Sequence, residues 1–442
     1  MRRTRVRSSG RVWNGRDWSA LDARSRRIEW AQRLVMVLVA GWFVYAQFFA
    51  GPEGMPAPHA PSITVAASPN DWPIVDGDLG ASRSTSANSH VGGEVTWTQD
   101  LGSPFSVPLI ADGTALYAAL SDARLVALEA DGGAERWTEQ LEFELRFAPP
   151  TLAGNRLYVL KRDGRVAALS AATGETVWES EVGASYAAAP AVADGVVYAY
   201  YGFEEADRSF TAPIIGIDAS TGEELWRQRV STVFPLIPPV ADSEHLAIAA
   251  SARVLIFDRA TGDQTYWFPF ARLGRPVSIA LVEGTVYAAS PRLVVAVDAD
   301  TTEPWHYSIR TAWFQFWAWG LAPRPPVPEM EWIAAAPPAD PLPMVVLSDR
   351  IIIAGAGGGV RAYSRATGET LWAAEFGPLS GAPVGAADGI VLVQDGRLLL
   401  VDSQDGGELA RMDLPVDGAR GVIVTTHGTY VTTESGGVLA IR

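Results

Sequence analysis

A sequence pattern of about 40 residues recurs along most of the chain, and this repetition restricts the fold more than any other feature. Two clear copies are Leu157–Trp178, LYVLKRDGRVAALSAATGETVW, and Ile351–Trp372, IIIAGAGGGVRAYSRATGETLW. Each copy has two short β-rich runs joined by a polar or glycine turn, then a T-G-E/D turn, then a run with tryptophan. Strands this short and apolar are not stable alone, so the copies must stack.

Tryptophan marks the last run of most copies, and its spacing defines the unit. The predicted structural positions are Trp97, Trp137, Trp178, Trp226, Trp267, Trp305 and Trp372. Ala410 takes the eighth position, and Thr302 replaces the turn glycine of the fifth unit. A period near 40 with four short strands per unit predicts a β-propeller blade, because a helical solenoid would need a helical periodicity that the sequence lacks.

The two ends of the repeat region complement each other. The last copy, HGTYVTTESGGVLAIR, ends at Arg442 before any tryptophan run, whereas Val95–Gly102 is a tryptophan run with no partner before it. Pairing these ends closes the ring and removes free sheet edges. We therefore predict an all-β fold, with one eight-bladed propeller over residues 72–442.

These repeats resemble the PQQ-like (pyrroloquinoline-quinone-type) β-propellers, whose repeat reads A-x-D-x-x-T-G-x-x-x-W. Ala219–Trp226 and its copies match it closely, and Trp72–Ser86, WPIVDGDLGASRSTS, resembles the segment that precedes such propellers. The resemblance implies that the repeat tryptophans dock between neighbouring blades. It also implies one of two classes: quinoprotein dehydrogenases with quinone and calcium in the ring, or non-catalytic scaffolds similar to the outer-membrane-protein assembly lipoprotein.

An uncharged segment precedes the repeats. Leu34–Ala50, LVMVLVAGWFVYAQFFA, would span about 25 Å as a helix, near the lower limit for crossing a bilayer. Residues 1–33 contain ten arginines against three acidic residues, which predicts a cytoplasmic tail and an extracytoplasmic (periplasmic or extracellular) propeller. We therefore predict a single-pass anchor at 34–50 and a proline-rich linker at 51–71. A cleaved signal peptide and a buried helix are the alternatives.

Composition excludes several classes of chemistry. The 442 residues include no cysteine, so disulfides, thiol nucleophiles, cysteine-bound metals and lipidated cysteines are impossible. Many quinoprotein dehydrogenases clamp the quinone with adjacent cysteines, and the assembly lipoprotein carries a lipid on cysteine, so the chain departs from both relatives. The formal charge of −15 repels nucleic acid, so we predict no nucleic-acid partner.

One insertion concentrates large apolar side chains. It follows Trp305, covers residues 311–343, and ends in a proline-rich stretch. Trp and Phe dominate protein and membrane-interface contacts, so we predict that it docks a protein partner or the membrane. The alternative is that the loop folds back over its own ring. The candidate docking residues are Trp313, Phe314, Phe316, Trp317, Trp319, Leu321 and Trp332.

The remaining motifs have ordinary structural interpretations. The glycine run at 354–359 lacks the lysine and helix of a phosphate loop and is a predicted hairpin turn, and the acidic run at 203–209 is a predicted hairpin tip. Asp76 and Asp78 alone cannot form a calcium loop, and the five histidines show no ligand spacing. We predict no catalytic, cofactor-binding or metal-binding residue.

These observations favour a membrane-anchored, non-catalytic scaffold or accessory subunit that binds proteins in a membrane or envelope complex. Two alternatives from other classes stay open. The first is a PQQ-dependent dehydrogenase, which an activity assay with added quinone and calcium would reveal. The second is a protein that binds a carbohydrate or envelope polymer, which glycan arrays would reveal.

Overall fold

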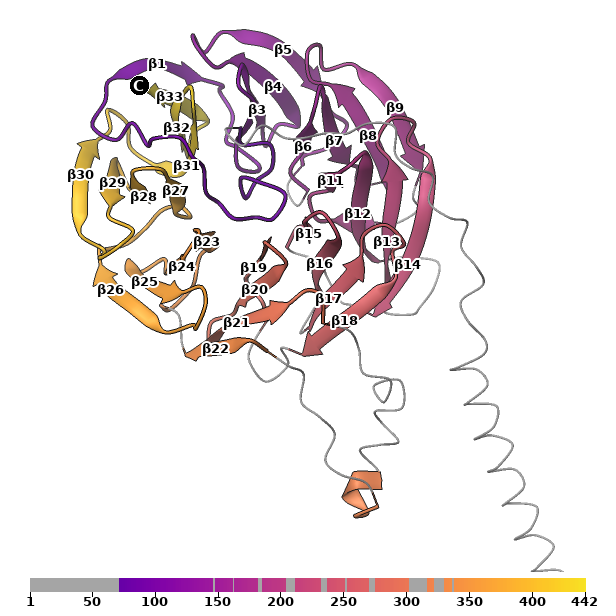
Figure 1. The fold of residues 1–442 in the computed structure, drawn as a ribbon. Coiled ribbons are helices and arrows are strands. Elements are labelled where there is room, and N and C mark those ends of the chain that lie inside the picture. Colours follow the sequence, from indigo (N-terminus) through magenta and orange to yellow (C-terminus); the bar gives the residue numbers. More distant parts are fainter. Residues whose placement is uncertain are drawn as a thin grey trace, which may run out of the picture. The chain divides into compact units, whose positions relative to one another are not determined.

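The computed structural model describes residues 71–442 apart from short segments at 146–147, 162, 182–184, 204–210, 232–236, 251–252, 270–274, 302–315, 322–329 and 336–337. Eight antiparallel sheets are arranged around a common centre (Figure 1). Each is a blade whose first strand lies near the centre and whose last strand lies at the rim. The predicted eight-bladed propeller is confirmed.

The first four blades follow one another along the chain. Blade 1 comprises β2 (Ile110–Ala111), β3 (Ala115–Ala119), β4 (Arg124–Glu129) and β5 (Glu135–Gln140). Blade 2 comprises β6 (Thr151–Ala153), β7 (Arg156–Leu160), β8 (Arg165–Ser170) and β9 (Thr176–Glu181). Blade 3 comprises β10 (Ser185–Ala187), β11 (Ala191–Ala193), β12 (Val196–Phe203), β13 (Thr211–Asp218) and β14 (Glu224–Ser231). Blade 4 comprises β15 (Val240–Ala241), β16 (His245–Ala250), β17 (Arg253–Asp258) and β18 (Gln264–Pro269).

The second half of the ring has the same order. Blade 5 comprises β19 (Ser278–Val282), β20 (Thr285–Ala289), β21 (Leu293–Asp298) and β22 (Trp332–Ala335). Blade 6 comprises β23 (Val345–Val346), β24 (Arg350–Ala354), β25 (Gly359–Ser364) and β26 (Thr370–Glu375). Blade 7 comprises β27 (Val384–Ala386), β28 (Gly389–Gln394), β29 (Arg397–Val401) and β30 (Glu408–Asp413). Blade 8 comprises β31 (Ala419–Thr425), β32 (Gly428–Thr433), β33 (Gly437–Ile441) and β1 (Val95–Asp100).

Burial differs between the middle and rim strands for a physical reason. The middle strand β3 is buried at every position, because both faces of a blade are covered by neighbouring blades. The rim strand β5 has four exposed residues, including charged Glu135 and Arg136. Charged side chains on an edge strand discourage pairing with another molecule.

The ends of the propeller close the ring as predicted. β1 pairs with β33 in antiparallel register, with Thr98 opposite Leu439. Main-chain hydrogen bonds also join the two ends of the propeller. The Glu94 N–H donates to the Arg442 carbonyl at 2.9 Å, and the Arg442 N–H donates to the Glu94 carbonyl at 3.0 Å. The first and last strands of the propeller therefore belong to one sheet (Figure 1).

Two of the predicted repeat positions require correction. Tyr266, and not Trp267, pairs with Ile256 where the other blades place their tryptophan, because this blade has one more residue between the turn glycine and the tryptophan. In blade 5, Trp332 of β22 pairs with Ala296 at the equivalent position. The long insertion therefore lies inside blade 5, between β21 and β22, whereas the sequence suggested that it follows the tryptophan strand.

The N-terminal predictions lie outside the described residues. These are the tail at 1–33, the anchor at 34–50 and nearly all of the linker at 51–71. Within the part of the chain that the structure describes, no helix is both long enough and apolar enough to span a bilayer.

Candidate functional site

The segment before the first blade crosses the centre of the ring. This lead-in segment, residues 72–87, is the indigo trace inside the ring in Figure 1. Trp72 exchanges main-chain hydrogen bonds with Ala111 of blade 1, at 3.0 and 2.8 Å. Leu152 of blade 2 donates to the Pro73 carbonyl at 2.8 Å. The innermost strands of blades 1 and 2 thus bind its beginning.

The rest of the lead-in segment continues around the ring in blade order. Its carbonyls accept hydrogen bonds from blades 4, 5, 6 and 7. The pairs are Ala241 to Leu79 at 3.0 Å, Leu281 to Gly80 at 2.8 Å, Val346 to Ser82 at 2.8 Å and Gly385 to Arg83 at 2.9 Å. Gly80 permits this approach, because a Cβ atom there would lie 2.3 Å from the Leu281 carbonyl oxygen. The lead-in segment therefore uses backbone groups that the inner strands would otherwise leave unpaired.

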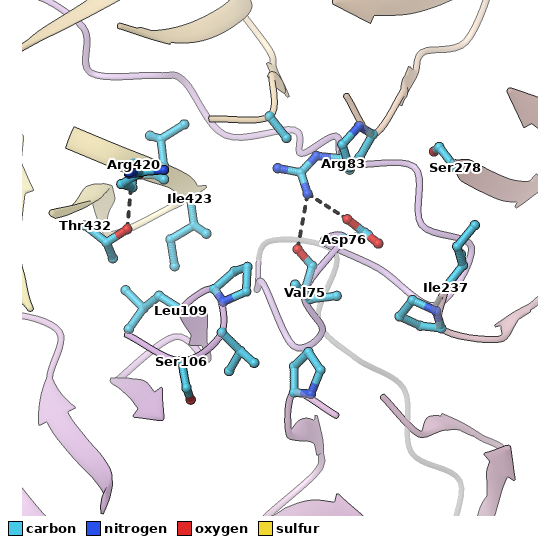
Figure 2. A pocket seen from close by; sticks show the side chains of 18 of the residues that line it. Val75, Asp76, Arg83, Ser106, Leu109, Ile237, Ser278, Arg420, Ile423 and Thr432 are labelled. Atoms are coloured by element: carbon cyan, nitrogen blue, oxygen red, sulfur yellow. Dashed lines mark hydrogen bonds and ion pairs between the residues drawn. The ribbon is translucent and has the colours of Figure 1, made fainter. Parts of the chain in front are cut away.

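A cavity of about 390 Å³ lies against the lead-in segment at the centre of the ring (Figure 2). Most of its wall is apolar and comes from loops and inner strands of several blades, including Leu109, Ile237 and Ile423. The polar lining residues are Asp76, Arg83, Ser106, Ser278, Arg420 and Thr432. The cavity is thus a central pocket with few polar groups.

Two of the three charged residues at this cavity, Arg83 and Asp76, pair with each other, whereas Arg420 pairs with Glu434 outside the lining. Arg83 is 7% exposed, and its guanidinium donates to Asp76 Oδ1 at 2.7 Å and to the Pro383 carbonyl at 3.0 Å. It also lies 5.8 Å from the centre of the Trp72 ring. Figure 2 shows Arg83 and Asp76 directed toward each other. Both charges are satisfied within the lead-in segment and blade 7, so loss of either partner would leave a buried charge unpaired and destabilise this segment.

Asp78 and Ser82 line a second, more open hollow of about 950 Å³. Asp78 accepts the Ser82 backbone N–H at 2.9 Å and the Ser82 hydroxyl. Burial raises the pKa of the Asp78 carboxyl, and the Ser82 hydrogen bonds partly oppose this rise. A carboxyl with a raised pKa can mark a functional site, but here its hydrogen bonds stay within its own turn.

The repeat tryptophans lie between blades. Trp137 of blade 1 covers the turn at Gly174 of blade 2, and its indole N–H donates to the Ala171 carbonyl at 3.0 Å. The other indole donors reach the next blade in the same way: Trp97 to Ala130 at 3.1 Å, Trp178 to Ala219 at 3.1 Å and Trp372 to Ser403 at 2.9 Å. Trp226 contacts Gly262, Trp267 lies beside Arg253 at 4.6 Å, and Trp305 lies outside the described residues.

The sequence of the repeats matches one family over most of the chain. This family is described as outer membrane protein assembly factor BamB, and it matches residues 15–145, 83–209, 121–264, 208–314 and 356–442. The chain belongs to this family. No curated protein matches the sequence significantly.

Solved structures share the fold of this BamB-family chain at low sequence identity. BamB from Moraxella catarrhalis is 19% identical with a TM-score of 0.57, over 79% of this chain and 97% of that one. Quinohemoprotein alcohol dehydrogenase from Comamonas testosteroni is 14% identical with a TM-score of 0.61, over 84% and 80%. The computationally designed Ika8 protein is 13% identical with a TM-score of 0.62, over 79% and 100%. These likenesses concern the fold alone.

The central cavity does not fit the quinone and calcium of the dehydrogenases. Calcium takes six to eight oxygen ligands, usually with several carboxylates. Among the described lining residues, Asp76 is the single carboxylate, and Arg83 already binds it at 2.7 Å. Tyr430 is the single aromatic residue in that lining, so the wall offers little to stack on a flat ring system.

The candidate docking residues divide into three groups. Phe316, Trp317, Trp319 and Leu321 are exposed, whereas Trp313 and Phe314 lie outside the described residues. The prediction that Trp332 is a docking residue is wrong. Trp332 is buried, it covers Gly368, and its indole N–H donates to the Arg365 carbonyl at 2.9 Å. It is therefore the blade 5 counterpart of the repeat tryptophans and does not belong to a docking surface.

Sequence reasoning missed the residues that share these blade junctions. Tyr158 and Trp178 both donate to the Ala219 carbonyl at 3.1 Å, and Arg156 donates to it at 2.7 Å. Burial raises the pKa of Tyr158, so its hydroxyl stays a donor. The sequence contained a signal for this tyrosine, because tyrosine recurs in the second strand of several copies, as in LYAA, LYVL and VYAA.

One cluster of possible ligands was also missed. Glu244, His245 and Asp300 place ligand atoms within 4.8 Å of one another. His245 Nε2 lies 3.2 Å from Asp300, and Nδ1 lies 3.3 Å from Asp242 without a hydrogen bond to it. These contacts describe a surface polar cluster and carry no metal assignment.

Proposed function

We propose that this chain is a membrane-anchored, extracytoplasmic propeller that acts as a non-catalytic protein-binding scaffold, or as an accessory subunit of a membrane or envelope complex. The pairing of Arg83 with Asp76 carries this proposal. Catalysis in a propeller of this kind would use charged groups directed into the central cavity. Here the buried guanidinium of Arg83 and the Asp76 carboxylate instead fasten the lead-in segment, and the third charged lining residue, Arg420, pairs with Glu434.

Membership of the BamB family supports a role among other proteins. The family description names assembly of outer membrane proteins, and the chain shares the repeats and the ring of that family. A rigid ring with a large loop surface suits partner binding, because rigid surfaces lose little conformational entropy on association. The partner of this chain is proposed to be another protein of its membrane.

The predicted anchor places the propeller outside the cytoplasm. Residues 34–50 carry no charge, and the arginine-rich tail precedes them. The absence of cysteine permits a direct test of this topology, because an introduced cysteine is unique. A membrane-impermeant thiol reagent should label Leu409→Cys in intact cells or spheroplasts, whereas Ser9→Cys should react only after lysis. The reverse pattern would place the propeller in the cytoplasm.

Partner binding is tested on the full chain in its native membrane. Crosslinking before solubilisation should yield a complex of defined mass and fixed stoichiometry that persists through two purification steps. A chain that always migrates alone would contradict the scaffold role. The dehydrogenase alternative has its own assay: purified protein with added quinone and calcium should give no dye-linked alcohol or sugar oxidation, and clear turnover would replace the proposal.

A further inference from the structure

Four large apolar side chains are exposed within six consecutive residues, 316–321, which we call the apolar tip. The exposed fractions are 43% for Phe316, 42% for Trp317, 62% for Trp319 and 73% for Leu321. The other large apolar side chains exposed on the described surface are Val177, Ile333, Leu371 and Leu409, and each stands alone on the rim strand of a different blade. Concentrated apolar exposure of this kind marks an interaction site.

The apolar tip is held in shape by its own backbone. Leu321 donates to the Phe316 carbonyl at 2.8 Å, and Gly320 donates to the Trp317 carbonyl at 2.9 Å. The Phe316 and Trp319 rings meet edge to face at 6.1 Å. The turn therefore presents its apolar side chains in a defined arrangement while leaving them accessible.

The charges around the apolar tip favour a lipid headgroup region as its partner. The whole chain has a formal charge of −15, yet residues 304–328 contain Arg310 and Arg324 and no acidic residue. The run between these two arginines is uncharged. Arginines that flank an apolar, tryptophan-rich run match the boundary between anionic headgroups and acyl chains, where indole rings concentrate.

We propose that the apolar tip inserts into the headgroup–acyl boundary of the bilayer that carries the predicted anchor. This inference rests on the proposed membrane anchoring. Trp317 and Trp319 enter this boundary with their rings, and Leu321 reaches the acyl region. Shallow insertion of a few side chains is the usual depth for interfacial elements, about 5–10 Å. The tip thereby gives the propeller a second contact with the membrane and fixes which loops face away from it.

Site-specific fluorescence tests the insertion. We would attach the environment-sensitive dye NBD to Leu321→Cys in the full chain, reconstituted in vesicles of phosphatidylcholine with some phosphatidylglycerol. Leu409→Cys on β30 is the matched control, because Leu409 is also an exposed leucine, at 53%. The dye at 321 should shift to shorter wavelength and be quenched severalfold more by spin-labelled lipids than the dye at 409. Equal quenching at both positions would overturn the proposal.

The assay separates failure of this inference from failure of the anchor. If the full chain does not float with the vesicles, the proposed anchoring is wrong. If it floats while the dye at 321 stays in water, the anchor stands and the lipid insertion is wrong. A dye that becomes buried only after membrane proteins are added also overturns the proposal, because the occupant is then a protein. A Trp317→Ser, Trp319→Ser double variant should reduce quenching at 321 and leave flotation unchanged.

Discussion

The contact between an indole ring and a glycine turn is the residue-scale unit that holds neighbouring blades together. Gly174 has φ of +77°, a backbone conformation that costs a residue with a side chain about 1–2 kcal/mol. A Cβ atom there would also lie 2.7 Å from Cε3 of Trp137, which is closer than real contacts allow. Glycine is therefore required twice at this turn, by its backbone conformation and by the packed ring.

The two requirements can be separated by matched substitutions. Gly102 has a similar φ of +72°, but its missing side chain would meet only open space. Gly102→Ala should cost about 1–2 kcal/mol for the backbone alone. Gly174→Ala should cost a further ~1–3 kcal/mol, because the ring must move from its packed position. Denaturant midpoints of the two variants measure the difference, and equal losses would show that the ring contact contributes nothing.

The corrected repeat position in blade 4 gives a second residue-scale prediction. Tyr266 is 1% exposed, whereas Trp267 is partly exposed and lies 4.6 Å from the Arg253 guanidinium. Tyr266→Ala should cost about 3–5 kcal/mol, the range for removing a buried aromatic ring. Trp267→Ala should cost about 1 kcal/mol or less, because a partly exposed cation–π contact is weak. If the tryptophan variant were the less stable one in thermal unfolding, the register assigned to β18 would be wrong.

These residues also show what the sequence can and cannot reveal. The turn glycine and the tryptophan of the same repeat, such as Gly174 and Trp178, follow one another closely in the chain, so the repeat and the ring fold could be predicted. Tyr266 could have been found by counting, since tryptophan stands four residues after the glycine in TGETVW but five after it in TGDQTYW. The hydrogen bond from Arg83 to the Pro383 carbonyl could not have been found from the sequence, because 300 residues separate the two and no local pattern encodes their contact.

At the scale of elements, the lead-in segment determines what the centre of the ring can do. It binds the inner strands of six blades through its main chain, and it places Asp78 in a buried turn. The sequence identified this segment by resemblance, but its path around the ring depends on contacts between distant residues. The location of the long insertion inside blade 5 was missed for a different reason. Trp332 lies one repeat period, about 40 residues, before Trp372 and begins the rim strand, but it was assigned to the insertion.

The raised pKa of Asp78 predicts a pH dependence with a definite sign. A carboxyl whose pKa is higher in the folded protein than in the unfolded chain stabilises the fold below its unfolded pKa, and that stability is lost as pH rises through the folded pKa. Asp78→Asn removes this loss and keeps an oxygen to accept the Ser82 N–H. The variant should therefore gain stability relative to the wild type as the pH rises above the unfolded pKa of about 4.

Asp349 provides a control of opposite sign. A hydrogen bond from Arg350 lowers the pKa of the Asp349 carboxyl, so its contribution is present at neutral pH and is lost as pH falls through the folded pKa. Asp349→Asn should lose stability at neutral pH, and the difference from wild type should shrink in acid. Thermal unfolding at several pH values measures both trends. Curves for Asp78→Asn that run parallel to those of the wild type would contradict the burial of a titrating carboxyl.

At the scale of the whole molecule, ring closure turns eight weak sheets into one unit. Each blade alone would expose both faces of its sheet, and a single sheet of four short strands is marginal in water. Stacking covers those faces, but an open arc would still leave its first and last blades unprotected. The pairing of β1 with β33 removes that weakness, because the last blade is completed by the strand that begins the propeller.

Deleting the final strand tests this role of closure. Residues 437–442 contain Val438, Leu439, Ala440 and Ile441, each fully buried and flanked by β1 on one side and β32 on the other. Their removal frees β1 from its ladder and exposes the edge of β32, so the truncated chain should unfold at lower denaturant and self-associate through that edge. Size-exclusion chromatography in detergent would detect the association. Arg442→Ala is the control: it retains the strand and removes the hydrogen bond to the Ala130 carbonyl, so it should stay in the wild-type size class with only a small loss of stability. A truncated chain that kept the size and the unfolding midpoint of the wild type would show that the other seven blades are stable as an open arc.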